Sequence, residues 1–234
     1  EIAAENDSAD IFVVNSCTVT AESDRKTRQA VRRFKRQNPH GIVVLTGCMP
    51  QAYPEKAEEL MEADIILGNK NNKDLPDMLD RFIRYGSRVF EVSEHKTGDS
   101  FQGDTITSFD ERTRAYVKIQ DGCNRFCSYC IIPYSRGRVR SKPLDELKNE
   151  LEELSRNGYK EVVLVGINLS SYGQDIGESF PDAVKTVNNI KGIELSRDLN
   201  YMSELILILN YNCTDVEKRF KIQEIIKDMT KYKR

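Results

Sequence analysis

Three cysteines occur within eight residues, in the stretch Cys123-Asn-Arg-Phe-Cys127-Ser-Tyr-Cys130. This spacing places three thiolates in one short loop, which is typical of a metal or iron–sulfur site rather than of structural disulfides. A structural zinc site takes four nitrogen or sulfur ligands, and the two histidines, His40 and His95, are distant in sequence. The bacterial ferredoxin run has four cysteines in a different spacing. The pattern favours a [4Fe–4S] cluster with three protein ligands and one iron open to a substrate or cofactor.

Two further cysteines each end an apolar run and precede a helical pattern. Cys17 follows the run at residues 11–14, and Cys48 follows the run at residues 41–45. Ligands collect beyond the carboxyl ends of parallel strands, and neighbouring strands lie about 4.8 Å apart, so two thiolates there could share a cluster. The alternative is a pair of buried free cysteines, which are common in proteins.

The elements that must position these cysteines alternate between apolar runs and helical patterns. We expect strands at residues 11–14, 41–45 and 64–67, and helices at about 21–37, 54–62 and 73–84. Continuous apolar strands that alternate with helices predict a parallel sheet covered on both faces. The first part of the chain is therefore expected to be a small doubly wound α/β domain.

The second part begins with a strand at residues 115–119 that runs directly into the three-cysteine loop. A helix with a leucine stripe, a strand at 161–165 and a short helix ending at Gly192 follow, which is how a (β/α) barrel begins. The expected organisation is a domain at 1–92, a linker at 93–113, an incomplete barrel core at 114–193 and a divergent tail at 194–234.

Composition limits the class of protein further. The 234 residues carry 35 Lys and Arg against 37 Asp and Glu, a formal charge of −2, which excludes a globally basic nucleic-acid binder but not a local basic patch. The longest aliphatic run, 205–209, is far shorter than the ~20 residues of a membrane helix. No secretory leader is visible and the chain starts at Glu1, so we expect a truncated start and a reducing cytoplasm.

Two stretches resemble one family. Residues 117–137, VKIQDGCNRFCSYCIIPYSRG, resemble the radical-SAM signature of the methylthiotransferases, and residues 13–33, VVNSCTVTAESDRKTRQAVRR, are similar to their N-terminal domain. The resemblance covers about residues 9–193 and is closest to the branch that adds a methylthio group to C2 of N6-threonylcarbamoyladenosine beside the anticodon of tRNA. The alternatives are a methylthiotransferase acting on a ribosomal-protein aspartate and a noncatalytic Fe–S-binding fragment.

The resemblance implies a set of cofactor contacts. Cys123, Cys127 and Cys130 would hold the cluster that binds S-adenosylmethionine, and a flavodoxin- or ferredoxin-type donor would supply the electron. Tyr129, within the signature loop, would face the adenine. Gly166 and Asn168, at the end of the next strand, would take the place of the glycine-rich contact with the amino group of S-adenosylmethionine. Ordinary packing is the alternative for Tyr129, while Arg136 and Arg138 could face the cofactor, RNA or solvent.

The resemblance also implies a second [4Fe–4S] cluster that supplies or carries the sulfur. Cys17 and Cys48 match two of its three ligands. In the family the third ligand precedes both of them in sequence. Cys213 is the remaining cysteine, and the residues around it do not resemble the motif of that third ligand. We therefore expect an incomplete ligand set, and the sulfur donor stays unidentified. The basic stretch at residues 25–36 could bind the tRNA backbone, or be a solvated face balanced by Glu22 and Asp24.

Overall fold

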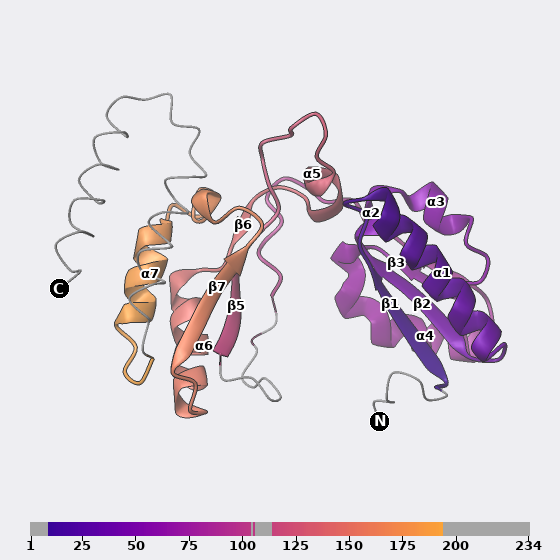
Figure 1. The fold of residues 1–234 in the computed structure, drawn as a ribbon, viewed down its shortest axis with the longest axis horizontal. Helices are drawn as coiled ribbons and strands as arrows, with labels where there is room; N and C mark the ends of the chain where they lie inside the picture. Colours follow the sequence, from indigo (N-terminus) through magenta and orange to yellow (C-terminus); the bar gives the residue numbers. More distant parts are fainter. Residues whose placement is uncertain (1–8, 104, 106–113, 194–234) are drawn as a thin grey trace. The chain divides into compact units, whose positions relative to one another are not determined.

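The computed structural model describes residues 9–103, 105 and 114–193, which form two compact units (Figure 1). The first unit contains the residues up to Asp99 together with Gly122–Arg138, and the second contains Ser100–Asp121 and the residues from Val139 onward. The three-cysteine loop therefore packs with the N-terminal unit. The domain boundaries expected from the sequence stay a prediction, and the tail at 194–234 lies outside the described residues.

A four-stranded parallel sheet forms the centre of the first unit. Its strands are β1 (Ile11–Ser16), β2 (Ile42–Gly47), β3 (Ile65–Leu67) and β4 (Val89–Glu91), in the order β1-β2-β3-β4. Helices α1 (Ala21–Gln37), α2 (Cys48–Ala52) and α3 (Pro54–Glu58) contribute to the core on one face, and α4 (Leu75–Tyr85) to the core on the other. The predicted α/β class, with a parallel sheet covered on both faces, is confirmed.

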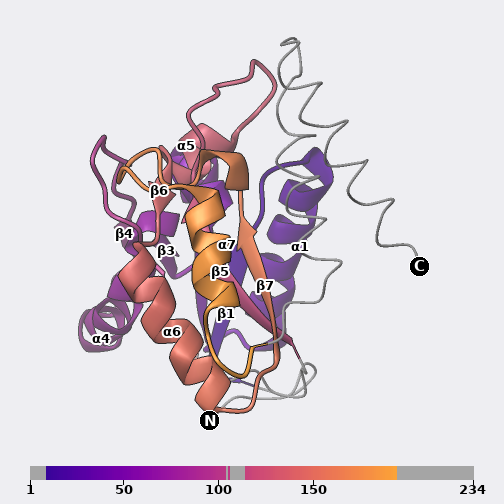
Figure 2. The same cartoon turned by 90° about the vertical axis from the view of Figure 1, so that its left-hand side faces the viewer.

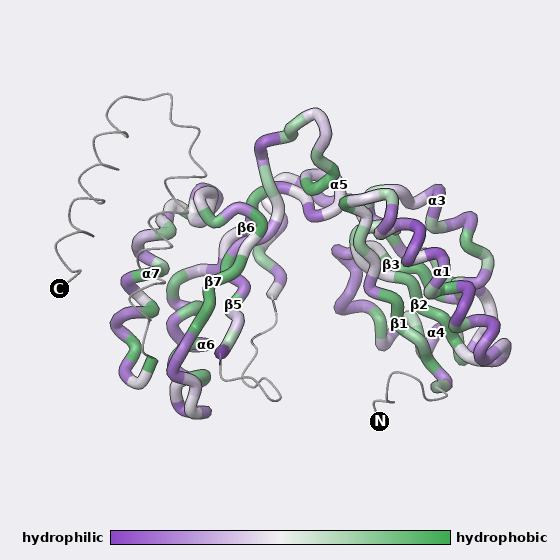
Figure 3. Tube along the Cα trace, in the orientation of Figure 1, coloured by the Kyte–Doolittle hydropathy of each residue, from purple (hydrophilic) through white to green (hydrophobic). Residues whose placement is uncertain are grey.

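The burial of the strands follows their place in this sheet. Every residue of β2 after Ile42 is buried, as its continuous apolar run predicts, and Figure 3 shows the strands as the apolar part of the unit. The run at residues 11–14 was expected to be buried in the same way, and this is wrong. Ile11 and Val13 are 40% and 50% exposed, because β1 is an edge strand of the described sheet and only its other face packs against α1.

The second unit contains a three-stranded sheet with helices on one side. Strands β5 (Arg114–Asp121) and β7 (Glu161–Gly166) are parallel, and β6 (Arg140–Ser141) is antiparallel to β5. Helices α6 (Leu144–Arg156) and α7 (Phe180–Asn188) lie side by side against this sheet (Figure 2). Strand and helix alternate as at the start of a (β/α) barrel.

Some boundaries differ from the predicted ones. The helix expected at 54–62 ends at Glu58, and the helix expected at 73–84 is preceded by a 3₁₀ turn, η1 (Asn69–Asp74). Strands β4 and β6 span only three and two residues, too few for a periodic pattern to predict them. Within the described ranges, no helix is long and apolar enough to cross a membrane.

Candidate functional site

Cys17 and Cys48 lie at the ends of two neighbouring strands. Ser16 of β1 pairs with Gly47 of β2, and Cys17 and Cys48 are the residues that directly follow this pair. The prediction that neighbouring strands bring these cysteines to one edge of the sheet is confirmed. Cys17 is exposed, whereas Cys48 begins α2 and is only 5% exposed.

The backbone around this pair is fixed by a serine and a glycine. Ser16 Oγ donates to the Thr46 carbonyl at 2.6 Å and accepts from the Met49 N–H at 3.0 Å, so it joins the end of β1 to the start of α2. Gly47 has a φ of +98°, and a Cβ at this position would lie 2.5 Å from the Ser16 carbonyl oxygen. Only glycine allows both this φ and this close approach of the two strands.

The loop of Cys123, Cys127 and Cys130 is closed at its base by backbone contacts. The Cys123 N–H donates to the Gly137 carbonyl at 3.0 Å. Gly122 has a φ of +72°, and an added Cβ would lie 2.0 Å from the Arg138 carbonyl oxygen. The two ends of the loop therefore meet at a point where no side chain fits.

The tip of the loop contains an unusual backbone conformation. Phe126 has a φ of +46°, the only positive φ of a non-glycine residue in the described part of the chain. Its ring contacts Tyr134 edge-to-face at 5.9 Å between centroids, and the Arg138 guanidinium lies 4.3 Å from its centroid. These contacts offset the cost of a left-handed conformation for an aromatic residue, about 1–2 kcal/mol. The Cys130 N–H then donates to the Cys127 carbonyl at 2.9 Å, forming a tight turn between the second and third cysteines.

The donor set fits an iron–sulfur cluster. The five cysteines that the structure describes are free thiols. Among the residues with described side chains, no three His, Cys, Asp or Glu lie in an arrangement that could hold a metal ion, so the backbone gathers the loop cysteines while their thiol groups do not converge. Cys127 is exposed and Cys123 and Cys130 are half-buried, so none of the three side chains is enclosed in a core.

Comparisons with known proteins match both parts of the chain. Residues 1–68 match Uncharacterized protein family UPF0004, and residues 117–232 match the Radical SAM superfamily. The threonylcarbamoyladenosine tRNA methylthiotransferase MtaB of Aquifex aeolicus is 40% identical over 200 residues, covering 84% of this chain and 48% of that protein. MtaB of Bacillus subtilis is 38% identical, and the match covers 72% of this chain and 37% of that protein. The tRNA-2-methylthio-N(6)-dimethylallyladenosine synthase of Clostridium tetani is 36% identical, and the match covers 83% of this chain and 44% of that protein.

The chain belongs to the radical-SAM methylthiotransferase family. It spans less than half the length of the three relatives named above. The Radical SAM match extends beyond residue 193, into the segment expected from the sequence to be a divergent tail. Membership implies a [4Fe–4S] cluster and S-adenosylmethionine as cofactors.

The other residues expected to contact the cofactor differ in their surroundings. Tyr129 is 90% exposed, so its ring is not held by packing beside the loop. In the second unit, Gly166 ends β7, and the Asn168 N–H donates to Gln120 Oε1 at 2.7 Å. The Asn168 side chain donates to Ser171 Oγ at 2.9 Å within the following turn. The cofactor contacts of Tyr129, Gly166 and Asn168 stay predictions.

The basic residues of helix α1 are partly neutralised by acidic neighbours. Arg25 pairs with Glu22 at 2.6 Å, and the hydrogen bond from Arg25 lowers the pKa of that carboxyl. Two longer-range ion pairs add to this: Arg32 with Glu62 at 3.2 Å and Lys35 with Asp64 at 2.8 Å. Val31 is buried and Phe34 stacks on Phe12, as the inward face of the helix predicts. These pairs favour the solvated, balanced face over a dedicated phosphate site.

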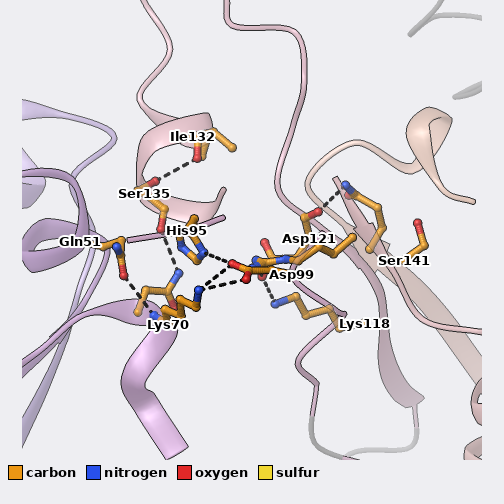
Figure 4. A network of polar contacts seen from close by, with 12 residues as sticks. Gln51, Lys70, His95, Asp99, Lys118, Asp121, Ile132, Ser135 and Ser141 are labelled. Atoms are coloured by element: carbon orange, nitrogen blue, oxygen red, sulfur yellow. Dashed lines mark hydrogen bonds and ion pairs between the residues drawn. The ribbon is translucent and has the colours of Figure 1, made fainter. Parts of the chain in front are cut away.

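A polar network beside the loop was not found by sequence reasoning (Figure 4). Lys70 Nζ lies 2.9 Å from a carboxylate oxygen of Asp99, and His95 Nδ1 lies 3.7 Å from the same carboxylate. Burial would raise the pKa of Asp99, but hydrogen bonds from Lys70 and the Lys96 N–H outweigh it and lower that pKa below its ordinary value. His95 and Asp99 fall in the segment interpreted as a linker, Lys70 lies well before it, and no local pattern distinguishes the three.

Proposed function

We propose that the chain is part of an enzyme that adds a methylthio group to C2 of N6-threonylcarbamoyladenosine next to the anticodon of tRNA. The observation that carries this proposal is the loop of three free cysteines, closed at its base by Gly122, inside a sequence that matches the Radical SAM superfamily. The enzyme would work in the cytoplasm, where a reducing environment keeps the thiols available.

Each loop residue has a defined part in this proposal. Cys123, Cys127 and Cys130 would ligate the cluster, and their thiol groups are free to do so. Gly122 and Phe126 would hold the backbone of the loop that carries the three cysteines. When bound, the cluster and S-adenosylmethionine supply the radical chemistry that removes a hydrogen atom from an aromatic C–H bond. The electron comes from a donor of flavodoxin or ferredoxin type.

Cys17 and Cys48 would provide two ligands of a second [4Fe–4S] cluster. Their placement after paired residues of β1 and β2 supports this role, because the Ser16 hydrogen bonds fix the backbone at both positions. A third ligand must come from outside the described residues. The source of the inserted sulfur is left open.

The choice of substrate follows from the relatives. The two MtaB enzymes named above are slightly more similar to this chain than the Clostridium tetani dimethylallyladenosine enzyme, at 40% and 38% against 36% identity. An anticodon-loop adenosine is single-stranded and can be unstacked into a pocket, which a base inside an RNA helix cannot. The N6 substituent then distinguishes the two candidate nucleosides.

Nucleoside mass spectrometry tests the proposal. The gene that encodes this chain would be deleted, and tRNA nucleosides compared with those of strains complemented by the intact gene or by its Cys123→Ala variant. We expect 2-methylthio-threonylcarbamoyladenosine to disappear on deletion and to return only with the intact gene. Loss of the methylthio-dimethylallyladenosine instead, or of methylthio-aspartate in a ribosomal protein, would show that the substrate is wrong.

A further inference from the structure

The three-cysteine loop is attached to the first unit through the short helix that follows it. Helix α5 (Ile132–Arg136) begins two residues after Cys130 and packs against α2, the helix that begins at Cys48 (Figure 1). Both helices belong to the same compact unit. The two groups of cysteines are thus joined by one helix–helix contact.

Side-chain amides reinforce this contact. Asn69 Nδ2, at the start of η1, donates to the carbonyl of Ser135 in α5 at 3.1 Å, and Ser135 is fully buried. Gln51, a buried residue of α2, accepts from the Lys70 N–H of η1 at 3.1 Å. The turn η1 therefore contacts both helices through specific hydrogen bonds, one to each.

The segment at residues 93–99 packs against the base of the loop. Gln51 Nε2 donates to the Ser93 carbonyl at 3.0 Å, and the Lys70–Asp99 ion pair closes the other end of the segment (Figure 4). Between these anchors, the His95 ring lies against Gly137, where an added Cβ would be 2.7 Å from His95 Cγ. Gly137 is the residue whose carbonyl accepts from the Cys123 N–H, so His95 abuts the closed base of the loop.

We propose that Gln51, Asn69 and His95 are positioning residues that fix the three-cysteine loop to the Cys48 helix. The orientation of the loop, and of the cluster that it holds under the proposed function, is then set by the N-terminal unit. Loop sequence alone would not determine it. Because the hydrogen bond from Asn69 satisfies a buried carbonyl, its loss leaves that carbonyl without this donor and loosens α5.

Hydrogen exchange of the metal-free chain tests the positioning itself. Asn69→Asp keeps the size of the side chain but cannot donate, so we expect amide exchange in α5 and α2 to rise about tenfold. Asn38→Asp is the matched control, because Asn38 Nδ2 donates to the Ala9 carbonyl at 3.0 Å at a site outside this network. It should leave α5 and α2 unchanged. Unchanged exchange in both helices of the Asn69→Asp chain, with circular dichroism showing an intact fold, would overturn the proposal.

A second measurement connects the positioning to the cofactor. After anaerobic reconstitution, we expect the reduced cluster of Asn69→Asp and His95→Ala chains to show broadened electron paramagnetic resonance signals and iron release to a chelator about tenfold faster than in Asn38→Asp. Identical signals and rates would contradict the link to the cluster. If no chain takes up iron while the exchange difference persists, the proposed function fails and the positioning stands.

Discussion

Gly122 closes the base of the three-cysteine loop, and Gly122→Ala is the sharpest single test of how the loop backbone serves the cluster. A methyl group at this position would lie 2.0 Å from the Arg138 carbonyl oxygen and 2.6 Å from the Gly137 carbonyl oxygen. Both neighbours are backbone atoms, so no side-chain rotation relieves the clash. The two ends of the loop must move apart.

The magnitude follows from these contacts. A φ of +72° costs alanine about 1 kcal/mol relative to glycine. Moving the Arg138 carbonyl from 2.0 Å to the 3.0 Å that real Cβ contacts require shifts the backbone by about 1 Å, which breaks the Cys123–Gly137 hydrogen bond of 3.0 Å. That bond contributes about 1 kcal/mol. We expect a total of at least about 2 kcal/mol, concentrated in the loop.

The assay is iron and sulfide content after anaerobic reconstitution, with hydrogen exchange of residues 122–138 as the local readout. Gly158→Ala is the matched control, because Gly158 has a φ of +88° and nothing within 4 Å of an added Cβ. The control should bind iron as the wild-type chain does, whereas Gly122→Ala should lose the iron that the three-cysteine loop holds. Equal iron content and equal loop exchange in the two variants would refute the reasoning.

Three further predictions concern other contacts. Phe126→Ala removes the ring that contacts Tyr134 and Arg138 at the loop tip and should speed iron release several-fold, while Phe126→Tyr should not. Equal rates of iron release from the two variants would contradict a stabilising role of the ring. Lys142 and Glu150 form a buried ion pair, so Lys142→Met alone should lower the free energy of unfolding by about 3–5 kcal/mol, and adding Glu150→Leu should restore most of it in urea denaturation. Since its pKa is lowered, Asp99 stabilises the fold at neutral pH and loses this effect as pH falls through that pKa. The difference in the free energy of unfolding between the wild-type and Asp99→Asn chains should therefore become smaller at acid pH.

The positions of the Cys17 and Cys48 pair were predictable because strong local signals surround them. An apolar run before each cysteine specifies a strand, and the strands of an alternating pattern pair in parallel. The exposed face of β1 was not predictable, since an apolar run does not reveal whether a strand is central or at an edge. Burial on both faces depends on neighbours that the run itself does not encode.

The surroundings of the three-cysteine loop were less accessible to sequence reasoning. The cysteine spacing specifies the chemistry, and Gly122 stands directly before the first cysteine, but Asn69 and His95 carry no local pattern. They reach the loop through contacts across 66 and 42 positions of sequence, to Ser135 and Gly137. The stretch at 93–99 looked like a linker because the contacts that anchor its two ends, to Gln51 and Lys70, lie in other elements and leave no periodicity.

The most direct test of the central claim is electron paramagnetic resonance of the reconstituted, reduced chain with and without S-adenosylmethionine. The account predicts a [4Fe–4S] signal that shifts when S-adenosylmethionine is added, because one iron is open to it. The shift should be absent from the Cys123→Ala/Cys127→Ala/Cys130→Ala chain and preserved in Cys17→Ala/Cys48→Ala. A shift on addition of S-adenosylmethionine that survives the triple substitution, or a wild-type signal that does not respond to S-adenosylmethionine, would contradict the account.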